Sequence, residues 1–136
     1  MPVDDPADHR VPLIKSYQDL QVWQKRMDLA AAVHRLAREL PPEETYRLRA
    51  QLTRAIASVP ANVAEGHSRA GKREFAHQVS IARGSLSEAE TFVLLGLRLG
   101  YFTQAQSDLI LNQSAEVGRM LTALHLRLAP ISTPAR

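Results

Sequence analysis

Cysteine is absent from the 136 residues, and aromatic side chains and long apolar runs are scarce. Without a thiol, the chain can form no disulfide framework, no thiol nucleophile and no cysteine-ligated zinc site. Its apolar runs fall short of the roughly 18 residues that a membrane-spanning helix needs. The N-terminal residues MPVDDPADHR carry acids and prolines where a signal peptide has cations and an apolar core. We therefore expect a soluble, cytoplasmic protein without a membrane partner.

The residues that are abundant favour helices. Apolar residues make up 45% of the chain and aromatic residues 5%, and alternating runs of β-branched residues are missing. Apolar residues spaced three and four apart predict helices at about 18–38, 43–66, 72–99 and 104–129. Short loops between helices of similar length favour antiparallel neighbours. We predict an all-α, antiparallel up-down-up-down four-helix bundle over residues 16–129, with flexible tails at 1–15 and 130–136.

Two of the predicted helices carry a second apolar stripe. The stripe on the first helix comprises Val22, Leu29, Val33, Leu36 and Leu40, and that on the third comprises Ile81, Ser85, Phe92, Leu95 and Leu99. A bundle core uses one stripe per helix, so the extra stripes either widen the core or contact another subunit, because large exposed apolar patches are unusual on monomers. On the second alternative the protein is a homo-oligomer with Leu36 and Phe92 at its interface.

Residues 58–66 read SVPANVAEG and place a proline inside the second predicted helix. Pro60 has no N–H, so the helix should bend or restart there, with Ser58 helping to cap the restart. Asn62 falls on the apolar stripe and needs a backbone partner for its amide. We interpret the segment as a structural motif that fixes helix geometry and register, in preference to a ligand site; its members are Ser58, Pro60, Asn62, Glu65 and Gly66.

Cations crowd the turn that follows, where His67, Arg69, Lys72 and Arg73 precede the third helix. In an up-down bundle this turn shares one end with Lys25 and Arg26 of the first helix and Arg127 of the fourth. The free N–H groups of a helix start favour anions, and phosphate fits both features. We expect nucleic-acid contact at Arg69, Lys72, Arg73, Lys25 and Arg26. The alternative is that these cations only keep the protein soluble.

The sequence gives no indication of catalysis. Residues 66–73, GHSRAGKR, approach a phosphate-binding loop, but Arg73 stands where that loop needs Ser or Thr, and a helix precedes it instead of a strand. Glu74 and His77 form a single Glu-x-x-His pair, whereas four-helix di-iron proteins use two. We predict that the protein is not an enzyme and uses no cofactor or metal.

Three stretches resemble a known family: DLQVWQK (19–25), LPPEETYRLRAQLTRAIASVPANVAEGHSR (40–69) and IARGSLSEAETFVLLGLRLGY (81–101). They are similar to the bacterial four-helix-bundle proteins named after open reading frames in 23S ribosomal RNA intervening sequences. The resemblance implies a protomer that assembles into a ring-like homopentamer. It also implies kinship with accessory proteins of diversity-generating retroelements, which are basic pentamers that bind nucleic acid and a reverse transcriptase. At a net charge of +3, this chain is less basic than those accessory proteins.

Two functions follow from the sequence. The first is a non-catalytic accessory protein that binds nucleic acid, structured RNA before DNA, through the phosphate backbone. The second is an oligomeric scaffold that presents a surface to a protein partner, such as a reverse transcriptase, without binding nucleic acid.

Overall fold

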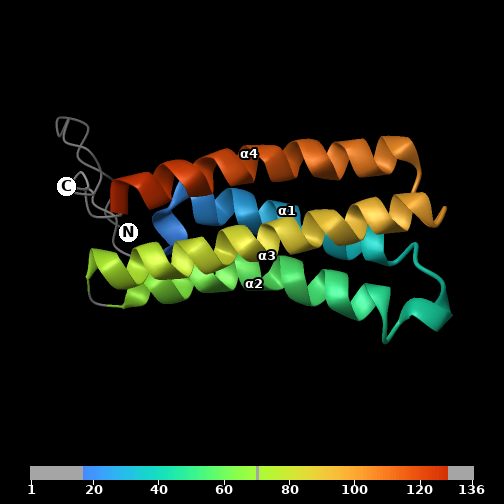
Figure 1. The fold of residues 1–136 in the computed structure, drawn as a ribbon, viewed down its shortest axis with the longest axis horizontal. Coiled ribbons are helices and arrows are strands. Elements are labelled where there is room, and N and C mark those ends of the chain that lie inside the picture. The colour runs from blue at the N-terminus through green and yellow to red at the C-terminus, as the bar shows by residue number, and fades with distance from the viewer. Residues whose placement is uncertain (1–16, 70, 129–136) are drawn as a thin grey trace, which may run out of the picture.

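The computed structural model describes residues 17–69 and 71–128, which form four long helices without a strand (Figure 1). The long helices are α1 (Gln21–Ala37), α2 (Leu48–Ser68), α3 (Lys72–Arg98) and α4 (Gln104–Leu128), and two short 3-10 helices are η1 (Tyr17–Asp19) and η2 (Pro42–Glu44). Successive helices run in opposite directions (Figure 1). The predicted all-α four-helix bundle is confirmed. The tails predicted at 1–15 and 130–136 lie outside the described residues.

The alternation of direction gives the bundle two ends. The basic end holds the turn between α2 and α3, the start of α1 and the end of α4, and the opposite end holds η2 and the turn between α3 and α4 (Figure 1). Among the described residues, no helix combines the length and the apolar character needed to cross a membrane.

One apolar stripe from each helix fills the core. Fully buried side chains include Leu29, Val33, Leu52, Val59, Val79, Val93, Val117 and Leu121. Leu36 lies in the same core and is only 8% exposed. The stripe on α1 is therefore the face that α1 buries within its own protomer. Leu36 packs inside the bundle and has little surface to offer to a neighbouring subunit.

The SVPANVAEG segment lies within a helix that runs unbroken through Pro60. Ser58 does not cap a restarted helix, because its hydroxyl donates to the carbonyl of Ala55 at 3.0 Å. The amide of Asn62 donates to the Ser58 carbonyl at 2.7 Å, so its partner lies one turn back in the same helix. All of these hydrogen bonds are internal to α2.

Gly66 ends this segment where α2 packs tightly against α3. A Cβ atom at Gly66 would lie 2.8 Å from the Cβ of Gln78 and 2.9 Å from a ring carbon of Phe75. Atoms at such distances clash, so any larger residue would push the two helices apart. Glycine therefore sets the spacing of α2 and α3 near the basic end.

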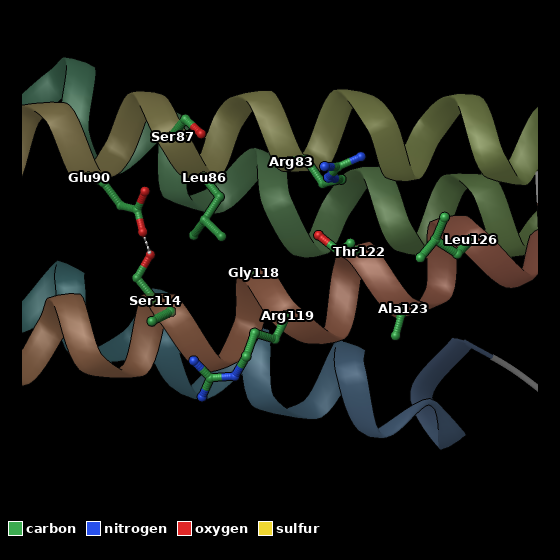
Figure 2. Close-up of a pocket in the computed structure, with 11 residues that line it drawn as sticks. Arg83, Leu86, Ser87, Glu90, Ser114, Gly118, Arg119, Thr122, Ala123 and Leu126 are labelled. Atoms are coloured by element: carbon green, nitrogen blue, oxygen red, sulfur yellow. Dashed lines mark hydrogen bonds between the residues drawn. The ribbon is translucent and has the colours of Figure 1, made fainter.

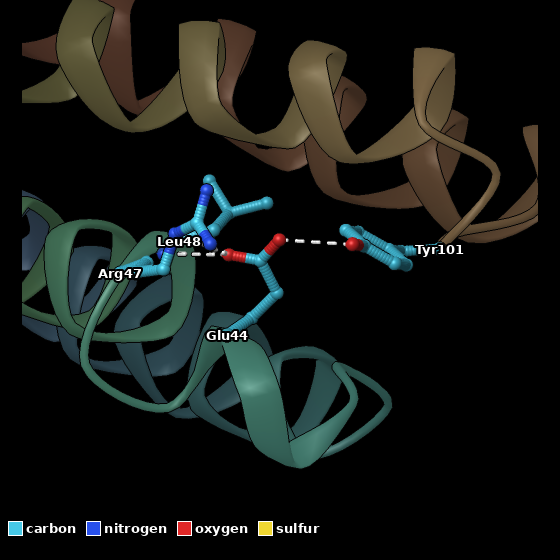
Figure 3. A network of polar contacts seen from close by, with 4 residues as sticks. All are labelled: Glu44, Arg47, Leu48 and Tyr101. Carbon is cyan, nitrogen blue, oxygen red and sulfur yellow. Dashed lines mark hydrogen bonds and ion pairs between the residues drawn. The ribbon is translucent and has the colours of Figure 1, made fainter.

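Glu44 organises the opposite end and explains why α2 begins at Leu48, five residues later than the sequence pattern predicts (Figure 3). Its carboxylate accepts the hydroxyl of Tyr101 at 2.8 Å and the backbone N–H of Leu48 at 3.3 Å. The hydrogen bond from Tyr101, followed by that from Leu48, lowers the pKa of Glu44. The carboxylate thus caps α2 and ties the η2 loop to the turn between α3 and α4.

Candidate nucleic-acid interface

A groove of about 550 Å³ opens at the basic end between the turn, α3 and the end of α4. Gly71, with φ at +95°, allows the chain to reverse sharply between α2 and α3. Apolar and basic side chains together line the groove: the apolar ones are Leu20, Phe75, Leu124 and Leu128, and the basic rim is formed by His67, Arg69, Lys72 and Arg127. The expectation that Arg127 meets the basic turn is confirmed.

Arg69 is held by carboxylates of its own chain. Its guanidinium lies 2.6 Å from Glu65, one helical turn earlier, and 3.9 Å from Glu74 on α3. The hydrogen bond to Glu65 raises the pKa of Arg69. The carboxylates of Glu65 and Glu74 therefore compensate part of the positive charge of Arg69 in the absence of a ligand.

Lys72 and Arg73 are the freer cations of the turn. Both are exposed, and within residues 17–69 and 71–128 neither side chain makes an ion pair or a hydrogen bond. They begin α3, and the N-cap residue Gly71 that precedes them supplies no side-chain cap. The first N–H groups of α3 thus remain available to an anion beside two unpaired cations.

Lys25 lies where α1 faces α4. Its ammonium group is 3.7 Å from the carboxylate of Glu116 on α4. This ion pair links two helices, and a phosphate at Lys25 would compete with Glu116.

Arg26 cannot contact nucleic acid in this fold, because it is 0% exposed. It occupies the core stripe of α1 between Val22 and Leu29. In the described part of the chain, none of its three side-chain nitrogens has a hydrogen-bond partner. Burial lowers the pKa of Arg26 to about 9. The expectation that Arg26 binds phosphate is therefore wrong.

A second groove, of about 600 Å³, runs between α3 and α4 and was not predicted from the sequence (Figure 2). Its floor contains Leu86 of α3 and Gly118 of α4, while Arg83 and Arg119 flank it from the two helices (Figure 2). The residues at 114, 118 and 122 of α4 are small, at a spacing of four, and this was the signal available in the sequence.

The polar side chains of the second groove differ in their pairing. The hydroxyl of Ser114 donates to the carboxylate of Glu90 (Figure 2). Arg83 and Arg119 make no ion pair or side-chain hydrogen bond with any described residue. No three His, Asp or Glu side chains of residues 17–69 and 71–128 lie close enough together to hold a metal ion.

Comparison with known proteins gave a family and solved structures of similar fold. The family model of the 23S rRNA-intervening sequence protein matches residues 18–123. A crystal structure from Bacteroides thetaiotaomicron, described as a protein with unknown function from the S23 ribosomal protein family, is 26% identical in sequence with a TM-score of 0.72. The match covers 76% of this chain and 97% of that chain. Comparison with curated protein sequences gave no match.

Proposed function

This chain belongs to the family of 23S rRNA-intervening sequence proteins, and we propose that it is a non-catalytic accessory protein that binds structured RNA as a ring-shaped homo-oligomer. The observation that carries the proposal is the groove at the basic end, where cations from the α2–α3 turn, α3 and α4 share one rim. Arg and Lys on such a rim attract the negatively charged phosphate backbone of RNA. These contacts do not depend on the base sequence. The link of the family to ribosomal RNA supports a cytoplasmic location.

Assembly compensates for the modest charge of the chain. At +3 per chain, a single protomer offers few phosphate contacts. A ring repeats the basic end once per subunit, so weak contacts add through multivalency. The exposed apolar stripe of α3 supports assembly, since Ile81, Leu95 and Leu99 are 41%, 43% and 54% exposed. The family resemblance supports five subunits.

A salt-dependent RNA titration tests the proposal. Wild-type protein and the triple variant Arg69→Ala/Lys72→Ala/Arg73→Ala are titrated against a structured RNA between about 50 and 200 mM salt, where backbone contacts weaken steeply. The variant should bind more weakly to every RNA sequence, and the slope of log K against log salt should flatten by roughly one unit per lost contact.

A charge-matched control separates this site from a general loss of charge. The variant Arg38→Ala/Arg47→Ala/Arg98→Ala removes three exposed cations from the opposite end of the bundle. It should bind nearly as tightly as the wild type. Wild-type protein that fails to bind RNA at about 50 mM salt contradicts the proposed function and leaves the protein-interaction scaffold. If Arg69→Ala/Lys72→Ala/Arg73→Ala binds as well as the wild type, the next surface to test is that of Arg47, Arg49 and Arg54.

A further inference from the structure

One flank of α3 carries an apolar ridge, defined here as Ile81, Phe92, Leu95 and Leu99. Ile81, Leu95 and Leu99 are exposed, whereas Phe92 is partly buried and packs against the core of its own protomer. These residues belong to the series 81, 85, 88, 92, 95 and 99, whose spacing of four and three places them on one stripe. The α3–α4 groove is lined by residues 83, 87 and 90 of the same helix. Each of these groove residues follows a residue of the ridge series by two positions, and two residues turn an α-helix by about 200°. Ridge and groove therefore point in directions about 160° apart around α3.

The groove is shaped to receive side chains. Leu86 points from α3 toward α4 at a position where Gly118 contributes no side chain (Figure 2). A Cβ atom added at Gly118 would make only an ordinary contact with Leu86, at 3.5 Å. The packing of α3 against α4 therefore leaves open space at Gly118, whereas the packing of α2 against α3 leaves none at Gly66.

The groove carries two cations, Arg83 and Arg119, and one carboxylate, that of Glu90, which accepts the hydroxyl of Ser114. Its excess of positive charge is complementary to a carboxylate on the ridge. Arg83 and Arg119 flank the groove without a partner in the described residues. Glu88 lies in the stripe of the ridge, and its exposed carboxylate likewise has no partner within residues 17–69 and 71–128.

We propose that the ridge of one copy docks into the α3–α4 groove of the next copy, with Glu88 facing Arg83 and Arg119. This inference rests on the homo-oligomer of the proposed function and assigns its two contact surfaces. Because ridge and groove are different surfaces, the contact is heterologous, and repeating it around an axis closes a ring.

The heights of the charged residues agree with a ring whose axis runs along the helices. The hydrogen bond from Ser114 to Glu90 sets the register of α4 against α3 and places Arg119 near the level of residue 85. Copies in a closed ring share one height along the axis, unlike copies in a helical filament. Glu88 then lies about 5 Å along the axis from Arg119 and about 8 Å from Arg83 of its neighbour. The long side chains can bridge these distances.

The proposed contact also orients the subunits. In a ring closed in this way every bundle points in the same direction along the axis. All copies of the groove at the basic end then face one rim, where a single RNA can reach several of them.

Complementation between two variants tests the heterologous contact. Leu95→Glu disables the ridge, and Gly118→Leu fills the groove, so each variant alone should be monomeric by light scattering at micromolar concentration. Mixed in equal amounts, one intact ridge meets one intact groove, and the mixture should form a species of two chains and nothing larger. Ala31→Leu is the control, because Ala31 is exposed on α1 and belongs to neither surface; it should assemble like the wild type.

Circular dichroism checks that each variant is folded, and Leu99→Glu replaces Leu95→Glu if the latter unfolds. A charge swap provides a second readout: Glu88→Arg should weaken assembly, and Arg83→Glu/Arg119→Glu in the same chain should restore it. A Gly118→Leu protein that still assembles overturns the groove assignment while leaving the oligomer intact. Monomeric wild-type protein overturns both, and the RNA titration on that same sample decides separately whether the basic end binds phosphate.

Discussion

Arg26 occupies the core stripe of α1 as an unpaired cation, and Arg26→Met measures what that placement costs the fold. The lowering of the Arg26 pKa by burial, from the ordinary value of an arginine to about 9, corresponds to roughly 5 kcal/mol of unfavourable free energy for the charged form at neutral pH. Methionine keeps much of the volume and fills irregular spaces, so little of the gain should be lost to a cavity. Allowing for relaxation around the charge, we expect the free energy of unfolding to rise by roughly 2–4 kcal/mol.

The pH dependence of this gain has a definite sign. A base whose pKa is lower in the folded state binds fewer protons there than in the unfolded state, so raising the pH favours folding. The cost of Arg26 is fully present below pH about 9 and is relieved as the pH rises above that value. The stability difference between Arg26→Met and wild type should therefore shrink by about 1.4 kcal/mol per pH unit above 9.

Urea unfolding followed by circular dichroism between pH 7 and 10.5 measures both effects. Taking the difference between the two proteins removes the titration of tyrosines and lysines that they share. Lys25→Met is the control, because the neighbouring Lys25 is partly exposed and its ion pair with Glu116 is worth at most about 1 kcal/mol. If Arg26→Met leaves stability unchanged or lowers it, Arg26 has a compensating partner and the reasoning fails.

Two further predictions concern the two ends of the bundle. Tyr101→Phe should raise the pKa of Glu44, because the hydroxyl that stabilises its carboxylate is lost. A carboxylate whose pKa is lower in the folded than in the unfolded protein stabilises the fold at neutral pH, and this stabilisation is lost as the pH falls. In urea unfolding the variant should therefore lose less stability than the wild type between pH 5 and 3. Gly66→Ala should lower the free energy of unfolding by roughly 1–3 kcal/mol through its clash with Gln78. In the same assay Gly84→Ala, in open space, should raise it by about 0.5–1 kcal/mol, and equal effects at the two glycines would contradict the close approach of α2 and α3.

Several features of the site could be predicted from spacing along the chain. The alternation of helix direction was enough to bring Arg127 to the basic turn. The burial of Arg26 could also have been predicted, since residue 26 completes the series 22, 26 and 29 with its spacing of four and three. Its charge instead suggested a position on the surface. The pairing of Arg69 with Glu65 follows from their separation of four residues, which brings side chains together on a helix.

The sequence by itself determined the helices and their approximate ends, because the period of the apolar residues and the breaking residues act over a few neighbours. The start of α2 escaped this reasoning, since it depends on Glu44 and on Tyr101, which lies 57 residues away in the chain. Only the tertiary structure decided which apolar stripe is covered: α1 buries its stripe in the core, while α3 leaves Ile81, Leu95 and Leu99 exposed. Both stripes have the same local spacing, and their burial depends on how closely neighbouring helices pack, which is set by contacts such as Gly66 against Gln78.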